Sequence, residues 1–423
     1  MSQHCEVKTV SVIGLGYIGL PTATMFASRG FPVIGVEVNP QVVNTINQGQ
    51  IHIVEPGLAE VVHAAVTSGR LRATTRPEPA DAFLLAVPTP FTGNHEPDLS
   101  YIEAATRSIA PVIKKGDMVI LESTSPVGTT EQLADWLAEA RPDLTFPQQV
   151  GEESDIRIAH CPERVLPGHI LRELVENDRI VGGMTPKCAQ AAAALYKTSI
   201  IGDCITTNAR TAEMCKLSEN SFRDVNIAFA NELSMICDKL DIDVWELIRL
   251  ANRHPRVNIL QPGCGVGGHC IAVDPWFIFH KTPEEARLIH MARLINDFKP
   301  QWVISRVESC VTELVSEGIA PEDIQIACLG LAFKADIDDL RESPALEITK
   351  SLGRKYLNRV CAVEPNIKKL PDELTGLGVA LVSLEDALST ARVVVLLVDH
   401  AEFKTATVTL GKQRLIDTKG IWA

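Results

Sequence analysis

Residues 9–37 read TVSVIGLGYIGLPTATMFASRGFPVIGVE, and this stretch decides the fold of the first part of the chain. A short apolar run is followed by Gly14, Gly16 and Gly19, then by a helical run and a second apolar run that ends at Glu37. The first glycine of such a pattern makes a tight turn, the second lets a diphosphate approach the backbone, and the third lets the helix pack on the strand. The stretch therefore predicts a βαβ unit that binds a dinucleotide, with the phosphates at the helix N-terminus.

The acidic residue at the end of the second strand selects the dinucleotide. A carboxylate there accepts a hydrogen bond from the ribose 2′-hydroxyl and repels a 2′-phosphate, so NAD is favoured over NADP. The cofactor contacts expected from this motif are Gly14, Gly16, Tyr17, Ile18, Gly19 and Glu37.

The rest of the chain alternates strand-like and helical runs. Apolar runs at 82–88, 117–124 and 157–163 have helical stretches between them, which is typical of a parallel, doubly wound sheet. A long helical pattern extends from about residue 206 to 253, and a second α/β block begins near residue 324. We expect an α/β protein with two Rossmann-like doubly wound domains joined by a central helical domain. The expected domains are 1–199, 200–300 and 301–423, with Pro300 ending a helix near the second boundary.

Composition excludes several classes of protein. At 423 residues the chain is too long for one ordinary core, and its formal charge of −13 argues against general nucleic-acid binding. A local cationic cluster could still bind an anionic small molecule. The eleven cysteines include no CxxC pair, so we expect neither a zinc site nor a disulfide framework. No apolar run is long enough for a membrane helix and no signal peptide is evident, so we expect a cytoplasmic protein.

The second informative stretch is 263–275, GCGVGGHCIAVDP. Its glycines would let backbone approach a bulky ligand, and Cys270 beside them is a candidate nucleophile. A thiolate can hold an aldehyde as a thiohemiacetal, and loss of a second hydride then gives a thioester that water cleaves. The hydrolysis needs a base, for which Asp274 and Glu163 are candidates, while His269 could be a base or a packing residue.

A third candidate site is on the long central helix. Glu213, Lys216, Asn220 and Arg223 are three or four residues apart, so on a helix they share one face. Such a polar face is often only solvated surface. Lysine and asparagine four residues apart can, however, both donate to one oxygen, which is what an alkoxide or a tetrahedral oxyanion requires.

Seven segments together resemble the UDP-glucose/UDP-N-acetylmannosamine dehydrogenase family over essentially the whole chain. They are VIGLGYIGLP, AVPTP, ESTSPVGTT, CPERVLPG, AEMCKLSENSFRDVNIAFANEL, GVGGHCIAVDPWF and GLAFKADIDDLRESPA. The resemblance implies an NAD-dependent, four-electron oxidation of a sugar C6 alcohol to a carboxylate. It also implies a homodimer formed through the central helices, and a C-terminal domain that holds UDP.

The resemblance assigns roles to residues by position in the motifs. Cys270 would be the nucleophile, Lys216 and Asn220 would stabilise oxyanions, Asp274 would assist hydrolysis, and Glu163 and Thr124 would position water. Further cofactor contacts would be Thr89, Thr124 and Arg341. The substrate contacts would be Glu163, Arg164, Val165, Lys216, Asn220, Arg253, His254, Arg256, Asn258, Gly267, Phe333 and Lys334.

Departures from the family pattern bear on the sugar. The loop reads GHCIAVDP, where the UDP-glucose branch usually has a lysine before the aspartate, and Glu37 replaces the commoner aspartate. Cys264 stands where proline is common, and we interpret it as incidental or as a second modifiable thiol. The loop favours the N-acetylhexosamine branch over the UDP-glucose branch. Within that branch the resemblance implies UDP-N-acetyl-D-mannosamine as substrate, in the synthesis of a bacterial surface polysaccharide of the enterobacterial common antigen type. UDP-N-acetylglucosamine and UDP-glucose are the alternatives.

Two other classes share parts of this pattern. A β-hydroxyacid dehydrogenase also combines a Rossmann domain with a helical lysine–asparagine pair, but it transfers one hydride and uses no thiol. A non-catalytic nucleotide-sugar sensor could keep the same scaffold. The second α/β block and the complete set of reactive residues favour the two-step enzyme, and the yield of NADH per sugar distinguishes the classes.

Overall fold

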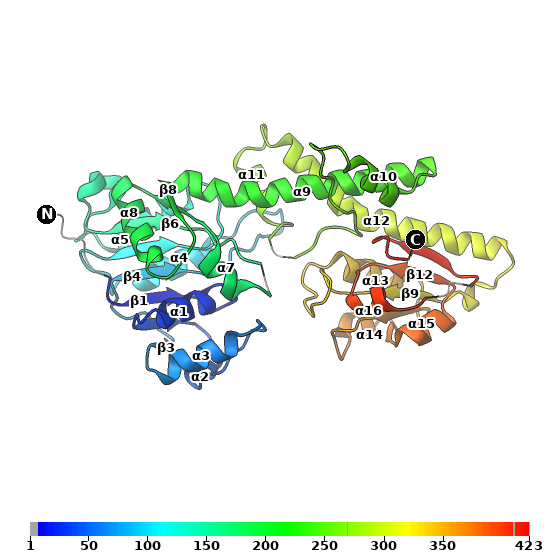
Figure 1. The fold of residues 1–423 in the computed structure, drawn as a ribbon, viewed down its shortest axis with the longest axis horizontal. Coiled ribbons are helices and arrows are strands. Elements are labelled where there is room, and N and C mark those ends of the chain that lie inside the picture. Colours follow the sequence, from blue (N-terminus) through cyan, green and yellow to red (C-terminus); the bar gives the residue numbers. More distant parts are fainter. Residues whose placement is uncertain (1–6, 167, 269, 409–410, 423) are drawn as a thin grey trace. The chain divides into compact units, whose positions relative to one another are not determined.

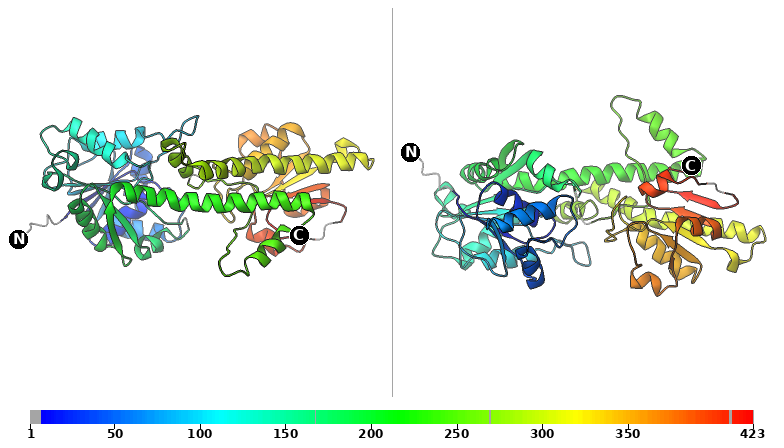
Figure 2. Two further views of the ribbon diagram at one scale, coloured as in Figure 1. Left: turned by 90° about the horizontal axis from the view of Figure 1, so that it is seen from above. Right: turned by 60° about the horizontal axis from the view of Figure 1, so that its bottom comes forward.

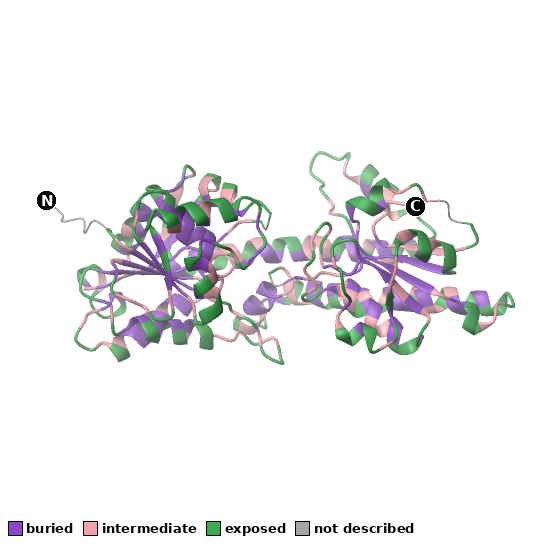
Figure 3. Ribbon diagram, turned by 90° about the horizontal axis from the view of Figure 1, so that it is seen from below, coloured by how far each residue is buried: buried purple, intermediate pink, exposed green. Residues whose placement is uncertain are grey.

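The computed structural model describes residues 7–166, 168–268, 270–408 and 411–422 (Figure 1). The chain forms two compact units. The N-terminal unit contains Met1–Glu219 and Trp276–Lys281, and the C-terminal unit contains Asn220–Pro275 and Thr282–Ala423. Each unit has its own sheet and its own apolar core, shown as buried ribbon in Figure 3.

The N-terminal unit is built on one eight-stranded sheet with the order β3-β2-β1-β4-β5-β6-β7-β8. Neighbouring strands are parallel except for β6 and β7, which are antiparallel. The predicted doubly wound sheet is thus confirmed, with one reversed pair that the apolar runs gave no means of seeing. The strands are β1 Val10–Ile13, β2 Val33–Val36, β3 Leu71–Thr74, β4 Ala82–Leu85, β5 Met118–Leu121, β6 Arg157–His160, β7 Arg179–Gly183 and β8 Cys204–Asn208.

Local sequence explains several helix starts in this unit. Asn39 and Thr185 each cap a helix through a side-chain oxygen, and a proline follows each at the first helical position, where its missing N–H costs nothing. The helices are α1 Gly19–Ser28, α2 Pro40–Asn47, α3 Leu58–Thr67, α4 Ser100–Ile109, α5 Thr129–Ala140, α6 Pro147–Val150, η1 Gly151–Glu153, α7 Ile170–Glu176 and α8 Pro186–Lys197.

The C-terminal unit repeats the architecture on a smaller scale. Its five strands are parallel in the order β11-β10-β9-β12-β13, which confirms the second Rossmann-like sheet. The strands are β9 Ile326–Leu329, β10 Val360–Val363, β11 Ala380–Leu381, β12 Val393–Leu396 and β13 Arg414–Asp417. The helices are α10 Val244–Ala251, α12 Arg287–Ser316, η2 Pro321–Asp323, α13 Pro344–Lys355, α14 Asp372–Thr375, α15 Leu384–Thr390 and α16 Ala401–Thr405.

Two helices contribute residues to both units: α9 Ala209–Leu240 and α11 Asp274–Lys281. The helical pattern expected from 206 to 253 is present, although β8 extends to Asn208 and the chain breaks at Asp241, whose φ is 56°. Within the C-terminal unit, residues 220–240 of α9 lie beside α12 (Figure 2).

The prediction that Pro300 ends a helix is wrong, because it lies inside α12. A proline inside a helix removes one hydrogen bond and costs roughly 3 kcal/mol. The missing bond would have joined Pro300 to the carbonyl oxygen of Asn296. Asn296 and Lys299 are both buried and hydrogen-bonded to α9, and Val303 is fully buried. Tertiary packing thus outweighs the local penalty. None of the helices in the described part of the chain is both long and apolar enough to cross a bilayer.

Candidate active site

The glycine loop after β1 has the geometry that the motif requires. Gly14 has a φ of +89°, and a Cβ on Gly19 would lie 1.8 Å from the carbonyl oxygen of Gly14. A Cβ on Gly16, by contrast, would meet nothing within 4 Å. Gly14 and Gly19 are therefore needed for the turn and for close packing, while Gly16 leaves open space where a diphosphate fits.

The residues around this loop also suit a dinucleotide. Glu37 lies at the end of β2, where its two oxygens accept from the backbone N–H groups of Leu15 (3.2 Å) and Asn39 (3.1 Å). Tyr17 is exposed in the loop. Ile18 precedes α1, and no side chain of the described residues caps this helix, so its first N–H groups can donate to phosphate oxygens.

The loops after β4 and β5 are joined beside this site. The Thr89 hydroxyl donates to the carbonyl oxygen of Thr124 at 2.5 Å, and the Ser123 hydroxyl bonds to both backbone groups of Val87. The loops leave the carboxyl ends of β4, which is next to β1, and of β5, which is next to β4, on the side of β1 where the strand order reverses. Ligands of open α/β sheets bind at this kind of position, so Thr89 and Thr124 lie where a cofactor contact is expected.

Glu163, after β6, is held by a buried arginine that sequence reasoning missed. Arg179 of β7 donates to one oxygen of Glu163 at 2.8 Å, and both side chains are almost fully buried. The other oxygen accepts from the N–H of Arg164 at 2.7 Å. Both carboxylate oxygens are thus engaged. No motif marked Arg179, because its partner is sixteen residues away along the chain and meets it only across the sheet.

Glu122 is a second buried carboxyl group near this ion pair. Glu122 follows β5, and its Oε1 accepts from the Tyr196 hydroxyl at 2.6 Å, while the guanidinium of Arg179 lies 5.1 Å from the centre of the Tyr196 ring. Burial raises the pKa of Glu122 to about 7. The charge of this cluster therefore changes near neutral pH.

The N-terminal part of α9 carries the polar face predicted from sequence, but this face is not uniformly solvated. Glu213 is buried and accepts from the N–H groups of Gly128 (2.7 Å) and Thr130 (2.8 Å) at the start of α5. Lys216, one turn later, is half-buried, whereas Arg223 is exposed. A polar stripe on a helix can therefore face a neighbouring element rather than water.

The remaining motif in this unit is tied to the same helix. Arg164 forms a 2.7 Å ion pair with Glu219 of α9, and its carbonyl oxygen accepts from Asn177. Val165 is partly buried against the core of the sheet. The predicted substrate-binding segment 163–165 is thus held through its backbone and through the Arg164 side chain.

In the C-terminal unit, the candidate nucleophile is exposed. Cys270 lies in the turn before α11, where its carbonyl oxygen accepts from the N–H groups of Val273 (3.0 Å) and Asp274 (2.9 Å). Asp274 is buried, and its Oδ2 accepts from the side-chain amide of Asn220 at 2.5 Å. The structure therefore brings together two predicted catalytic residues in a contact that sequence did not predict. His269 lies outside the described residues.

The glycines before Cys270 pack against the loop after β9. A Cβ on Gly267 would lie 2.3 Å from the carbonyl oxygen of Glu342, and one on Gly268, whose φ is +80°, would lie 2.9 Å from the Phe333 ring. Only glycine fits at these two positions without displacing the backbone or the ring. Gly267 and Phe333, both predicted substrate contacts, are thus neighbours.

Other predicted contacts in this unit are exposed. Lys334 is exposed, and the Arg341 guanidinium pairs with Asp339 of its own loop at 2.6 Å. The segment 253–258 is also exposed, and Asn252 closes it by bonding both backbone groups of Ile259, at 2.7 and 3.0 Å. This segment carries the predicted substrate contacts Arg253, His254, Arg256 and Asn258.

The second sheet has an acid at the position equivalent to Glu37, but it is used differently. Glu364 follows β10 and is buried. Its Oε2 accepts from the N–H groups of Leu331 (2.7 Å) and Ala332 (3.1 Å) and lies 3.0 Å from the Nε2 atom of His400. Like Glu37, this carboxylate accepts from backbone N–H groups of the loop before it, but it is buried and also contacts His400, so it is poorly placed to bind a ribose.

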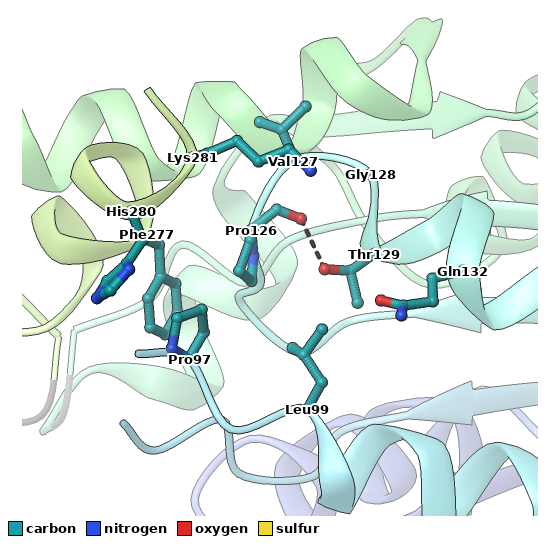
Figure 4. A pocket seen from close by; sticks show the side chains of 10 residues that line it. All are labelled: Pro97, Leu99, Pro126, Val127, Gly128, Thr129, Gln132, Phe277, His280 and Lys281. Carbon is teal, nitrogen blue, oxygen red and sulfur yellow. Dashed lines mark hydrogen bonds between the residues drawn. The ribbon is translucent and has the colours of Figure 1, made fainter. Parts of the chain in front are cut away.

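A cavity of about 220 Å³ lies in the N-terminal unit among the loop before α4, the start of α5 and α11 (Figure 4). Its wall is mostly apolar, and Thr129 there donates to the carbonyl oxygen of Pro126 at 2.7 Å. None of the predicted site residues lines it. The lining residues are Pro97, Leu99, Pro126, Val127, Gly128, Thr129, Gln132, Phe277, His280 and Lys281.

The fold and the glycine loop define a dehydrogenase with a dinucleotide-binding sheet and a second Rossmann-like sheet. Sequence models of the UDP-glucose/GDP-mannose dehydrogenase family match its NAD-binding domain at residues 8–200, its central domain at 210–298 and its UDP-binding domain at 327–423. The chain belongs to this family. It is an NAD-dependent dehydrogenase with a UDP-sugar substrate, and the expected cofactor is confirmed.

Individual relatives match over nearly their whole length. One is the NDP-N-acetyl-D-galactosaminuronic acid dehydrogenase of Ralstonia nicotianae, 65% identical over 99% of this chain and 97% of the relative. Another is the UDP-N-acetyl-D-mannosamine dehydrogenase of Yersinia pestis, 63% identical over 98% of this chain and 99% of the relative. The structure of the UDP-D-ManNAc dehydrogenase from Pyrococcus horikoshii is 40% identical, with a TM-score of 0.87 and coverage of 98% and 96% of the two chains.

Proposed function

We propose that the chain oxidises C6 of UDP-N-acetyl-D-mannosamine to a carboxylate in two steps, with the intermediate bound to Cys270. The observation that carries this proposal is the pairing of Asp274 with Asn220 at 2.5 Å, four residues after an exposed thiol. A single oxidation to a carbonyl needs neither the thiol nor a buried carboxylate beside it. A thioester that must be hydrolysed needs both.

Residues Gly14, Gly16, Gly19 and Glu37 would hold NAD, which accepts a hydride from C6 in each oxidation when it is bound. The Cys270 thiolate adds to the C6 aldehyde, forming a carbon–sulfur bond and an oxyanion. Loss of the second hydride leaves a thioester. Water then attacks the acyl carbon, the carbon–sulfur bond breaks, and the acid and the Cys270 thiol are released.

Two donors would stabilise the oxyanions of this sequence. The side-chain amide of Asn220 has two hydrogens, of which one is bonded to Asp274, so the second can be donated to a substrate oxygen. By its position in the motif, Lys216 supplies a cationic donor one helical turn earlier. An ammonium–oxyanion contact is strongest where water is excluded.

Asp274 is our choice for the base that activates water. Glu163 is a poorer candidate, because Arg179 and the N–H of Arg164 already engage its two oxygens. We assign Glu163, together with Thr124, to positioning. Asp274 accepts from the side-chain amide of Asn220, which orients its carboxylate.

The identity of the sugar is the least constrained part of the proposal. The Ralstonia nicotianae and Yersinia pestis relatives are 65% and 63% identical, yet their names differ in the configuration of the N-acetylhexosamine. The sugars in both names carry an N-acetyl group, and this supports an N-acetylhexosamine over glucose as the substrate of this chain. A nucleoside diphosphate of N-acetylgalactosamine is therefore the second candidate substrate.

The test is a count of NADH formed per sugar with limiting UDP-sugar and excess NAD. Two NADH per UDP-N-acetylmannosamine, with a uronic acid as product, are expected. One NADH would indicate a single oxidation, as in β-hydroxyacid dehydrogenases, and would remove the role of Cys270. Parallel assays with the UDP derivatives of N-acetylgalactosamine, N-acetylglucosamine and glucose identify the sugar.

A paired substitution tests the covalent step. Cys270→Ser should reduce acid formation by at least 1,000-fold, because an alkoxyl nucleophile is far less reactive at neutral pH than a thiolate. Cys310→Ser, at a half-buried cysteine of α12, is the matched control and should retain activity. Acid formation by Cys270→Ser at the wild-type rate would contradict the covalent mechanism.

We also propose that the enzyme is a homodimer formed through α9 and α12. Phe222, Phe229 and Ile236 recur every seven residues on α9 and are exposed, with Phe222 70% exposed. Leu288 and Phe298 are exposed on the neighbouring α12. Apolar side chains at this spacing on adjacent helices are typical of helix–helix association, so a second copy of the chain is the expected partner.

The domain bounds, the cellular location and the pathway that we propose rest on the resemblance to the family. We retain the three domains 1–199, 200–300 and 301–423, in which the last would hold the UDP group. We propose that the enzyme acts in the cytosol, where thiols remain reduced, and serves the synthesis of a surface polysaccharide of the enterobacterial common antigen type. In the proposed dimer, the exposed segment 253–258 would contact substrate.

A further inference from the structure

The buried face of α9 in the C-terminal unit is polar, which is unusual for the packed side of a helix. Asn220, Asp224, Asn231 and Ser234 are all buried, and each makes a side-chain hydrogen bond to another segment of this unit. Buried polar groups are costly unless they are paired, so these bonds constrain the structure strongly. The apolar residues buried on this part of the helix are small, namely Ala228, Ala230 and Cys237, whereas the large side chains of Phe222 and Phe229 are exposed.

Two residues of this face bind the two ends of the Cys270 loop, residues 263–274. At the first end, the side-chain oxygen of Asn231 accepts from the N–H of Gly263 at 2.9 Å. At the other end, the amide of Asn220 donates to Asp274 at 2.5 Å. Asn220 and Asn231 are eleven residues apart, which is three helical turns, so they lie on the same face and about 16 Å apart along the helix.

The loop between these two contacts is long enough to move unless both ends are fixed. Eleven residues can span about 36 Å when extended, more than twice the separation of the two contacts. The backbone changes direction at Gly268, whose φ is +80°, and Gly267 and Gly268 pack against the loop after β9. The course of the backbone leading to Cys270 therefore depends on the contact at Gly263 as well as on this packing.

Asn231 is itself oriented by a chain of buried hydrogen bonds. Its Nδ2 donates to Oδ1 of Asn296 at 2.9 Å, and Nδ2 of Asn296 donates to the Asp224 carboxylate at 2.8 Å. Arg293 donates to the same carboxylate at 2.6 Å. Because Asp224 accepts, Asn296 must present its nitrogen to Asp224 and its oxygen to Asn231. Asn231 is then left with its oxygen facing Gly263, and this is the only self-consistent direction for the chain.

We propose that Asn231 is a positioning residue for Cys270, acting through the backbone of Gly263 and oriented by Asn296 and Asp224. It contacts the backbone at the start of the loop rather than the thiol. The inference rests on the proposed role of Cys270 as nucleophile. It adds a residue outside the reactive set, on which the placement of the thiol depends.

The principal test is Asn231→Asp in the full-length enzyme. The carboxylate can still accept from Gly263, but it places an oxygen against Oδ1 of Asn296 where a donor is needed. Misplacement of a reacting group by about 1 Å can cost about 100-fold in rate, so we expect kcat to fall by about 10- to 100-fold. The KM values for NAD and UDP-sugar should change less than threefold.

The matched control is Ser234→Ala, on the same buried face of α9. Ser234 is bonded to Lys299 of α12 and to its own helix rather than to the loop. This variant should lose stability without losing kcat. An equal loss of kcat in both variants would show that general loosening of α9, and not the Gly263 contact, limits the reaction.

A second readout does not depend on the reaction. Hydrogen exchange of the backbone amides in 263–268, and the rate at which iodoacetamide alkylates Cys270, should both rise in Asn231→Asp and stay at wild-type values in Ser234→Ala. If the wild type oxidised no UDP-sugar, the proposed function would fail while these measurements still tested the positioning role.

Should Asn231→Asp not fold, Asn296→Ala removes the orienting partner without adding charge and should show the same changes. Wild-type exchange and kcat in the folded variant would overturn the proposal.

Discussion

Replacing the buried Glu122 by glutamine should remove the loss of stability that ionisation of this carboxyl group causes in the N-terminal unit above pH 5. The carboxyl group is 1% exposed and its pKa is raised by burial from 4.5 to about 7. Glutamine keeps an oxygen that can accept from the Tyr196 hydroxyl, which now bonds to Oε1 at 2.6 Å. It cannot ionise.

The sign follows from the two pKa values. Because the folded-state pKa is the higher one, the folded state binds the proton more tightly, and the stabilisation from this proton is complete below pH 4.5 and lost as pH rises through 7. The full shift of about 2.5 pKa units corresponds to about 3.4 kcal/mol. Between pH 5 and pH 8 the free energy of unfolding of the wild type should fall by about 2.5 kcal/mol from this group, and the glutamine variant should not show this fall.

The assay is urea unfolding of the wild type and Glu122→Gln at pH 5 and pH 8, followed by circular dichroism. The transition of the N-terminal unit is identified by its shift when NAD is added. Glu153→Gln, at an exposed glutamate of the same unit, is the control and should follow the wild type at both pH values. If the difference in unfolding free energy between Glu122→Gln and the wild type were the same at pH 5 and pH 8, the raised pKa and the reasoning built on it would be refuted.

Two further substitutions test buried and exposed surfaces. Arg179→Leu should destabilise the N-terminal unit by about 3–5 kcal/mol, because it leaves the Glu163 carboxylate buried without its cationic partner. Arg179→Lys should cost less, and a loss below 1 kcal/mol for the leucine variant, measured by urea unfolding, would argue that Glu163 is not stabilised by this pair. Phe229→Asp should convert the proposed dimer to monomer at micromolar concentration, because it places a charge in the middle of the apolar stripe on α9. Sedimentation velocity measures this, and an unchanged sedimentation coefficient in a dimeric protein would place the interface elsewhere.

Local sequence was sufficient for much of the fold. The stretch 9–37 contains its own strand, turn and helix signals, and the structure has β1, α1 and β2 where that stretch predicts them. The second Rossmann-like sheet was also predictable, because its three central strands β9, β10 and β12 are continuous apolar runs, as buried parallel strands require. These features depend on residues that are close together in the chain.

Local rules failed where distant segments decide the outcome. Pro300 continues a helix because Asn296 and Lys299 beside it are held by α9. The pair of β6 and β7 is antiparallel, although both strands look like ordinary apolar runs. For Pro300, contacts between segments far apart in sequence outweigh a local penalty of roughly 3 kcal/mol. For β6 and β7, the residues within each strand do not encode which direction the neighbouring strand runs.

The same distinction applies to the candidate site. The sequence by itself determined the reactive residues, because Cys270, Lys216, Asn220 and Asp274 stand in motifs whose chemistry can be read from residue type and spacing. Only the tertiary structure showed that Asn220 donates to Asp274. Motifs give the identity of reacting groups, since chemistry depends on the side chain itself.

The supporting residues could not be found in this way. Arg179 and Asn296 belong to no motif, and Asn231 stands in a motif that gave it no role. Each acts through a partner that only the folded chain brings near. Which oxygen of a carboxylate is occupied, and which way an amide points, depend on burial and on hydrogen bonds between distant segments. These properties arise when water is excluded, and so they were decided by the tertiary structure alone.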